Sequence, residues 1–187
     1  MNDAFNAFET VESKPWTHQP SYELKTTIMP EQSEKRFDPR MHSAEHIVNQ
    51  TMIRMFHSDR CFSAHIEKKK SKLDYRFDRP LSDEEVMELE NRVNEVILAD
   101  MPVSEEFVPK AEAGEQFSLM RLPEDAGEII RIIRIGDYDA CACIGPHVKS
   151  TGQIGGFRVV SASFDGGVLR IRYRLAKPEG RESPPSL

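Results

Sequence analysis

Apolar residues recur every three or four positions in two long stretches of the chain, which predicts two principal helices. The stripe of the first stretch consists of Met41, Ala44, Val48, Met52 and Met55. Asp38 before Pro39 offers an N-cap and a first helical residue that needs no N–H group. The pattern therefore predicts an amphipathic helix that begins at Asp38-Pro39.

The second helix is predicted over residues 81–99. Its stripe consists of Val86, Leu89, Val93, Val96 and Ile97. Ser82 and Glu85 have the spacing of a capping box, in which each side chain bonds the other residue's backbone N–H. A shorter helix over residues 111–120 is also predicted, although Gly114 opposes it.

Alternating or β-branched stretches predict strands at 61–66, 73–77, 103–108, 128–135, 139–143, 157–164 and 168–175. The isoleucine-rich segment 128–135 favours a central strand, and a weak alternation over 22–29 suggests an edge strand. Asp165-Gly166-Gly167 predicts a hairpin turn. We therefore predict an α+β fold, a mainly antiparallel sheet with the two principal helices packed on it.

At 187 residues the chain suits one domain with a substantial core. We expect a partly ordered extension over 1–37, a metal-binding domain over 38–176 and a disordered, Pro- and Ser-rich tail over 177–187. No apolar run approaches the ~20 residues of a membrane span, and we see no signal peptide. Three cysteines do not suggest a disulfide framework, so we expect a cytoplasmic protein without membrane partners. The net charge of -6 opposes general nucleic-acid binding but allows a local basic patch.

His42 and His46 are four residues apart, so both imidazoles leave the same side of the predicted helix. Such a pair can bind one zinc ion. In the metalloprotease helix a glutamate directly follows the first histidine, whereas Ser43 stands there in this chain, which argues against a peptidase. The alternative interpretation is two helix histidines that are solvated or partly buried.

Cys143 and His147 form a second pair with the same spacing, separated by Gly145-Pro146, which predicts a tight turn. Thiolate and imidazole are both zinc ligands. We predict that His42, His46, Cys143 and His147 form one zinc site. The alternative for the second pair is an inert buried cysteine beside a surface histidine.

The two runs resemble the editing module of alanyl- and threonyl-tRNA synthetases and its freestanding AlaX-type relatives. The family pattern is His-Thr/Ser-x-x-His, followed downstream by Cys-x-Gly-Thr-His-Val-x-x-Thr-Gly-x-Ile-Gly. The chain matches it at His42, Ser43, His46, Cys143, Gly145, His147, Val148, Thr151, Gly152, Ile154 and Gly155. The resemblance covers about residues 38 to 175, including a Leu73-Asp74-Tyr75 stretch similar to the family's Leu-Asp-Phe strand. One departure is Pro146, which stands where the family has threonine.

The resemblance implies a freestanding hydrolase that removes a wrong small amino acid, serine above all, from mischarged alanine or threonine tRNA. It implies zinc as the cofactor and mischarged tRNA as the partner. Ser43, Glu45 and Gly145 are the candidate substrate contacts. No catalytic side chain is assigned, and a metal-bound water is the expected nucleophile. Four protein ligands would close a tetrahedral site, so catalysis needs an open position, a fifth ligand position or a loose ligand.

Two other functions remain open. One is a non-enzymatic, zinc-stabilised module that binds tRNA or protein, and the other is a different metal-dependent hydrolase on the same scaffold. Basic side chains at Lys68-Lys69-Lys70, and at Arg170, Arg172 and Arg174 on one face of the last strand, are solvated by default. Their alternative role is contact with tRNA phosphates.

Overall fold

The computed structural model describes residues 38–123 and 125–177. The predicted N-terminal extension, the edge strand over 22–29 and residues 178–187 of the predicted tail lie outside them. The helices are α1 (Pro39–Phe56), α2 (Asp83–Leu98) and α3 (Lys110–Gln116), with a short 3-10 helix η1 (Thr151–Gln153). The strands are β1 (Ser63–His65), β2 (Ser71–Arg76), β3 (Val103–Pro109), β4 (Ile129–Ile135), β5 (Asp139–Ala142), β6 (Phe157–Asp165) and β7 (Val168–Leu175).

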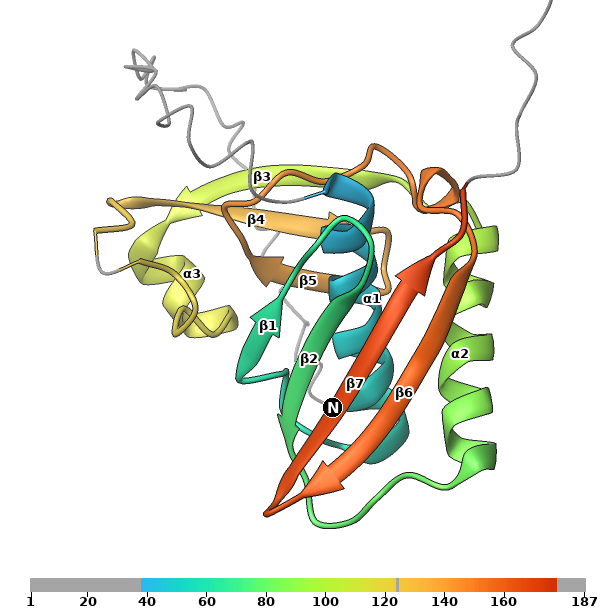
Figure 1. Ribbon diagram of the computed structural model, residues 1–187. Helices are drawn as coiled ribbons and strands as arrows, with labels where there is room; N and C mark the ends of the chain where they lie inside the picture. The colour runs from blue at the N-terminus through green and yellow to red at the C-terminus, as the bar shows by residue number, and fades with distance from the viewer. Residues whose placement is uncertain (1–37, 124, 178–187) are drawn as a thin grey trace, which may run out of the picture.

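These strands form two antiparallel sheets, which confirms the predicted α+β fold (Figure 1). One sheet has the order β1-β2-β7-β6 and the other the order β3-β4-β5, where the sequence had suggested a single sheet. β4 lies in the middle of its sheet, as its isoleucines predict. In the other sheet, the hairpins β1–β2 and β6–β7 are joined by the pairing of β2 with β7.

Helix α1 begins where the sequence predicts, because the Asp38 carboxylate accepts from the N–H of Arg40 at 2.9 Å. The helix ends at Phe56, because the next residue, His57, has a left-handed backbone with φ 53°. Its apolar stripe is buried except for the partly buried Met55, but so are His42, Glu45 and His46 on its polar side. The amphipathic pattern thus describes only part of this helix, since residues 41–49 are buried all round.

Helix α2 carries the predicted capping box between Ser82 and Glu85. Its buried residues Leu89, Val93, Val96 and Ile97 are those of the predicted stripe, with Val86 less deeply covered. Helix α3 ends at Gln116 rather than at 120, because Phe117 takes an extended backbone. It packs through Ala113 on the three-stranded sheet in a small apolar cluster of its own.

The inner face of the four-stranded sheet covers one side of α1 (Figure 1). The buried residues Leu73, Tyr75, Ile171 and Tyr173 share this core with Met41 and other apolar residues of the helix. The Tyr173 hydroxyl donates to the Met41 carbonyl at 2.7 Å, which ties β7 to the first turns of α1. No helix among the described residues has the length and apolar character needed to cross a membrane.

Candidate metal centre

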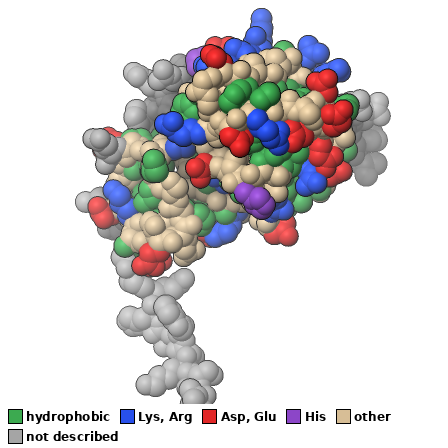
Figure 2. All heavy atoms as spheres, turned by 90° about the horizontal axis from the view of Figure 1, so that it is seen from below, with side chains coloured by type: hydrophobic (Ala, Val, Ile, Leu, Met, Phe, Trp, Pro, Cys, Tyr) green, Lys and Arg blue, Asp and Glu red, His purple; other side chains and the backbone are tan. Residues whose placement is uncertain are grey.

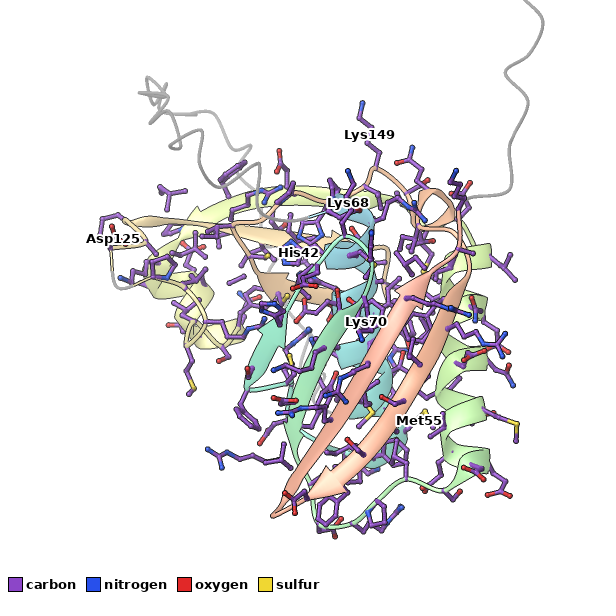
Figure 3. The ribbon with its side chains drawn as sticks, in the orientation of Figure 1. His42, Met55, Lys68, Lys70, Asp125 and Lys149 are labelled. Atoms are coloured by element: carbon purple, nitrogen blue, oxygen red, sulfur yellow. The ribbon has the colours of Figure 1, made fainter. Side chains whose placement is uncertain are left out.

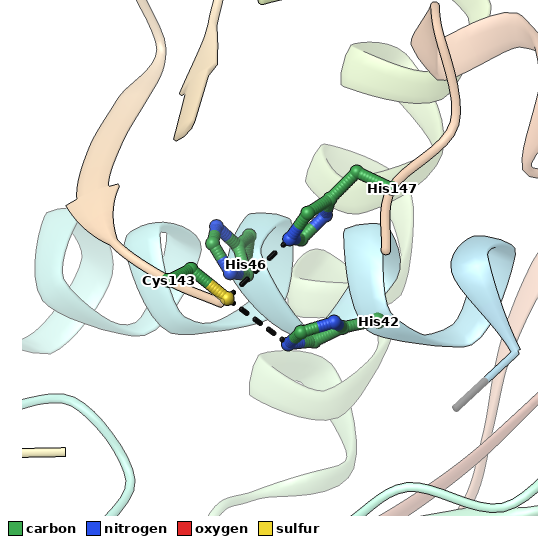
Figure 4. Close-up of side chains that lie close together, drawn as sticks. All are labelled: His42, His46, Cys143 and His147. Atoms are coloured by element: carbon green, nitrogen blue, oxygen red, sulfur yellow. Dashed lines mark hydrogen bonds between the residues drawn. The ribbon is translucent and has the colours of Figure 1, made fainter. Parts of the chain in front are cut away.

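The four side chains predicted as metal ligands converge (Figure 4). His42 and His46 project from α1, and Cys143 and His147 come from the loop that follows β5. One ligand atom from each residue lies within 4.8 Å of the others. The fold thus brings together two pairs about a hundred residues apart in the sequence; that they hold a metal stays a prediction.

His42 is oriented by the loop that it faces. Its Nδ1 donates to the carbonyl oxygen of Pro146 at 3.3 Å, and its Nε2 lies 3.4 Å from the Cys143 sulfur. A Cβ on Gly145 would lie 2.1 Å from Cε1 of His42, a distance that no real packing allows. Only glycine therefore lets the loop backbone approach the ring this closely.

His147 is oriented by Ser43, which is completely buried on α1. The serine Oγ lies 3.0 Å from Nδ1 of His147 and accepts from the N–H of Val148 at 3.2 Å. The other ring nitrogen, Nε2, lies 3.5 Å from the Cys143 sulfur. A hydroxyl at this helix position thus both anchors the loop and turns His147 toward the centre.

His46 has a different group of neighbours. Its Nδ1 lies 3.4 Å from Oδ2 of Asp139 and 3.3 Å from the Cys141 sulfur, which leaves Nε2 for the centre. Asp139 is buried, and its other carboxylate oxygen is bonded to Arg60. Burial would lower the pKa of His46, but Cys141 and Asp139 raise it well above its ordinary value. A carboxylate behind a histidine is the usual way in which proteins fix a metal-binding imidazole.

Cys143 has the protonation state that metal binding needs. Burial would raise the pKa of its thiol, but hydrogen bonds from His147 and His42 lower that pKa to about 3. Arg131 on β4 holds the backbone of the loop, since its guanidinium donates to the carbonyl oxygens of Cys143 and Gly145 at 3.3 and 2.8 Å. At neutral pH the sulfur is therefore a thiolate, the form that ligates metals.

The ligand spacing fits zinc. Zinc–nitrogen and zinc–sulfur bonds of about 2.0–2.3 Å at tetrahedral angles place a nitrogen and a sulfur about 3.6 Å apart. The two distances from the Cys143 sulfur to His42 and His147, 3.4 and 3.5 Å, are close to that value. Three imidazoles and one thiolate are also a donor set that zinc accepts.

The three residues predicted to contact the substrate, Ser43, Glu45 and Gly145, are engaged with other parts of the protein. Ser43 and Glu45 are buried and bonded to protein groups, and Gly145 packs against His42. Burial would raise the pKa of Glu45, but the charges of His46 and Arg121 lower it to about 2. The Glu45 carboxylate accepts from Arg121 and from Asn49, each at 2.7 Å. Contact of these three residues with a substrate stays a prediction.

Sequence reasoning did not find the supporting residues Asp139, Arg60, Arg131 and Arg121. Each lies far from its partner along the chain, and none stands in a motif with its own spacing. Asp139 is the start of β5, which was predicted only as a strand leading to the ligand turn. The one available signal was a group of charged residues beside β-rich segments, which is common on protein surfaces.

We predict that Asp139→Asn weakens zinc binding roughly 10- to 100-fold, because an amide holds the His46 imidazole less firmly than a carboxylate. Competition with a chromophoric chelator measures the affinity. Asp165→Asn, at the exposed end of β6, removes the same charge far from the centre and should leave the affinity unchanged. Equal zinc affinity in the two variants would show that Asp139 does not support His46.

Gly145→Ala should displace the His42 ring and reduce zinc binding, since the new methyl group would overlap that ring. Gly114→Ala is the matched control, because a Cβ there meets Leu119 at an ordinary 3.8 Å. In helix α3 that alanine should stabilise the fold by about 0.5–1 kcal/mol. Zinc titration and thermal melting of both variants test this, and a Gly145→Ala protein with full zinc affinity would contradict it.

Comparison with known proteins shows similarity to one domain of aminoacyl-tRNA synthetases. A family model described as the second additional domain of threonyl and alanyl tRNA synthetases matches residues 130–172, which include Cys143 and His147. The alanine–tRNA ligase of Pseudothermotoga lettingae is 31% identical over 150 residues, or 79% of this chain and 17% of that protein. The enzyme of the same name from Bacillus subtilis is 34% identical over 133 residues, or 70% of this chain and 15% of the relative.

A third relative, the alanine–tRNA ligase of Aeropyrum pernix, is 38% identical over 107 residues, which cover 56% of this chain. The matches span only 12% to 17% of the length of these three ligases. The similarity thus concerns one domain of a much longer enzyme. Residues 130–172, which carry Cys143 and His147, thus match the second additional domain of threonyl and alanyl tRNA synthetases, and the chain is similar to one part of alanine–tRNA ligases.

Proposed function

We propose that this domain hydrolyses the ester bond of a mischarged tRNA, with serine on alanine or threonine tRNA as the foremost substrate. The observation that carries the proposal is the convergence of three imidazoles and a thiolate in the part of the chain that matches the synthetase domain. The relatives' names connect that domain with aminoacylated tRNA. Hydrolysis of an ester requires a polarised carbonyl and an activated water, and a zinc ion held by the three histidines and Cys143 would supply both kinds of activation.

The protein's own contribution is orientation. Pro146, Ser43 and Asp139 each contact the Nδ1 of one histidine. The Nε2 atoms of His42 and His147 consequently both face the Cys143 sulfur. Fixed ring orientations reduce the reorganisation needed when charge develops on an ester oxygen.

Access to the centre is from the loop side. Ile144 is exposed and Pro146 and His147 are partly exposed, whereas the helix side with Ser43 and His46 is closed. An aminoacyl ester would therefore approach over the 143–147 loop. It would first meet the exposed Ile144 and the partly exposed Pro146 and His147, since Gly145 is buried.

One observation favours a second candidate, a non-enzymatic zinc-stabilised module. Four protein ligands within one site satisfy tetrahedral zinc and leave no position for water or substrate. In that case zinc would contribute to folding, and the domain would bind tRNA without hydrolysing it. The partial exposure of His147 favours the enzyme, because a ligand at the surface can yield its place to a substrate.

We predict that the wild-type protein deacylates seryl-tRNA and that chelation of zinc, or His46→Ala, slows this at least about a hundredfold. That loss corresponds to about 2.7 kcal/mol in the barrier. Release of labelled serine from preloaded tRNA is the measurement. His65→Ala, which removes an exposed histidine on β1, is the control and should retain the wild-type rate.

Circular dichroism decides between the two candidates. A chelated protein that stays folded and loses turnover supports the enzyme. If the wild-type protein binds zinc, unfolds on chelation and releases no serine, the deacylase proposal is wrong and the zinc-stabilised module is favoured.

The proline beside the last ligand provides a further test. The Pro146 carbonyl oxygen accepts a hydrogen bond from His42, which a carbonyl of any residue at this position could do. Proline differs from threonine because it has neither a backbone N–H nor a hydroxyl group. Pro146→Thr should raise the rate on seryl-tRNA by up to about tenfold, as one hydrogen bond to the ester contributes about 0.5–1.5 kcal/mol. Pro146→Ala restores the N–H alone and so separates the two groups. An unchanged or lower rate with threonine would mean that the proline serves this protein's own specificity.

A further inference from the structure

The outer face of the four-stranded sheet is rich in positive charge. The inner residues of β2 and β7 are buried against α1, so the alternate residues point away from the helix. The outward positions of β2, β6 and β7 hold the basic residues Lys72, Arg76, Arg158, Arg170, Arg172 and Arg174 and the acidic residues Asp74 and Asp165. Six basic against two acidic residues leave an excess of four positive charges on a chain whose net charge is -6.

Four of these residues, Lys72, Arg158, Arg172 and Arg174, form what we call the cationic face. Within it like charges stand directly opposite one another across the strands, Lys72 against Arg172 and Arg158 against Arg174. Like charges in such positions destabilise a sheet. These like-charged pairs therefore lower the stability of the folded protein rather than raise it.

Within the part of the chain that the structure describes, the three arginines of this face lack acidic partners, whereas Lys72 lies 3.8 Å from the Asp74 carboxylate. Arg170, one row further along the sheet, bonds the Asp74 carboxylate at 2.7 and 2.9 Å. By contrast, Arg158, Arg172 and Arg174 form no ion pair within residues 38–123 and 125–177. On the surface seen from below, basic and acidic side chains are interspersed (Figure 2). An anionic partner would supply the missing countercharge.

The cationic face lies at the same end of the molecule as the metal centre. Tyr173 stands between Arg172 and Arg174, and its hydroxyl bonds the carbonyl of Met41, the residue before His42. The Arg40 guanidinium donates to the Ala176 carbonyl just beyond β7, so the start of α1 and the end of β7 are joined. The exposed Lys68 and Lys70 of the β1–β2 turn are at this end too (Figure 3).

We infer that the cationic face binds the sugar–phosphate backbone of the tRNA whose aminoacyl end enters the metal centre, an inference that rests on the proposed function. Arginine guanidinium groups suit phosphate oxygens, which accept paired hydrogen bonds. Opposite Arg172 and Arg170, β6 presents Ser161 and Ser163. Serine hydroxyls also contact phosphates, whereas a membrane-binding surface would present aromatic or aliphatic side chains.

Fluorescence anisotropy with uncharged tRNA tests the inference on the full chain. The double variant Arg172→Gln/Arg174→Gln should bind roughly tenfold more weakly, and the slope of log affinity against log salt should fall by roughly 1.4–1.8. The matched control is Arg79→Gln/Arg92→Gln, which removes two exposed arginines at and near α2 that are paired with Glu85 and Glu88. It should retain the affinity and slope of the wild type.

Stability provides an independent readout. The Arg172→Gln/Arg174→Gln protein should melt at the same or a higher temperature, because the change removes repulsion across the strands. A lower melting temperature would mean that these arginines serve the fold instead. Equal losses of affinity in both double variants, an unchanged salt slope, or binding to phosphatidylserine vesicles in place of tRNA would overturn the inference.

The test separates this inference from the proposed function. Salt-dependent tRNA binding through the cationic face, without any release of serine, would leave the inference standing and overturn the deacylase. Serine release at the wild-type rate by Arg172→Gln/Arg174→Gln, under conditions where tRNA is below saturation, would overturn the inference alone.

Discussion

Burial of the polar side of α1 is the constraint on which the rest of the structure depends. Histidine, serine and glutamate side chains in an interior cost free energy unless each polar atom has a partner. For the histidines and Ser43 of α1, partners come from residues 139–148, through Asp139, the Pro146 carbonyl and the N–H of Val148, whereas Glu45 is bonded by Arg121 and Asn49. The placement of the ligand loop that gives these buried side chains their hydrogen-bond partners therefore also brings the four candidate ligands together.

Charge around the centre is balanced by arginines from several elements. Glu45 is paired with Arg121 and Asp139 with Arg60, and Arg131 donates hydrogen bonds to carbonyl oxygens of the ligand loop. Buried carboxylates are costly unless they are paired and hydrogen-bonded. These pairs hold both carboxylates ionised beside the histidines, and the thiolate of Cys143 is the remaining anion, the one most directly available to a metal.

The metal centre and the cationic face occupy two sides of the same strand end. β7 presents Tyr173 inward to α1 and its neighbouring arginines outward, because side chains alternate along a strand. The proposed deacylation would need both a reactive site and a surface that binds the RNA chain leading to it. In this fold a single strand links the two, so their spacing is fixed by backbone geometry.

The sequence by itself determined the helices, most strands and the identity of the four candidate ligands, because periodicity, capping residues and ligand spacing are local signals. The His-x-x-x-His and Cys-x-x-x-His runs each had the spacing that puts both ligands on one side of a helix or turn. Where those signals were weak, as at the end of α3, the boundary was misjudged. The rest was decided by tertiary structure. The division into two sheets, the burial of residues 41–49 of α1 on all sides, the support of His46 by Asp139 and Arg60, and the need for glycine at position 145 all depend on which distant segments meet. Contacts of this kind leave no local period in a sequence, since each joins residues separated by tens of positions whose proximity exists only in the folded chain.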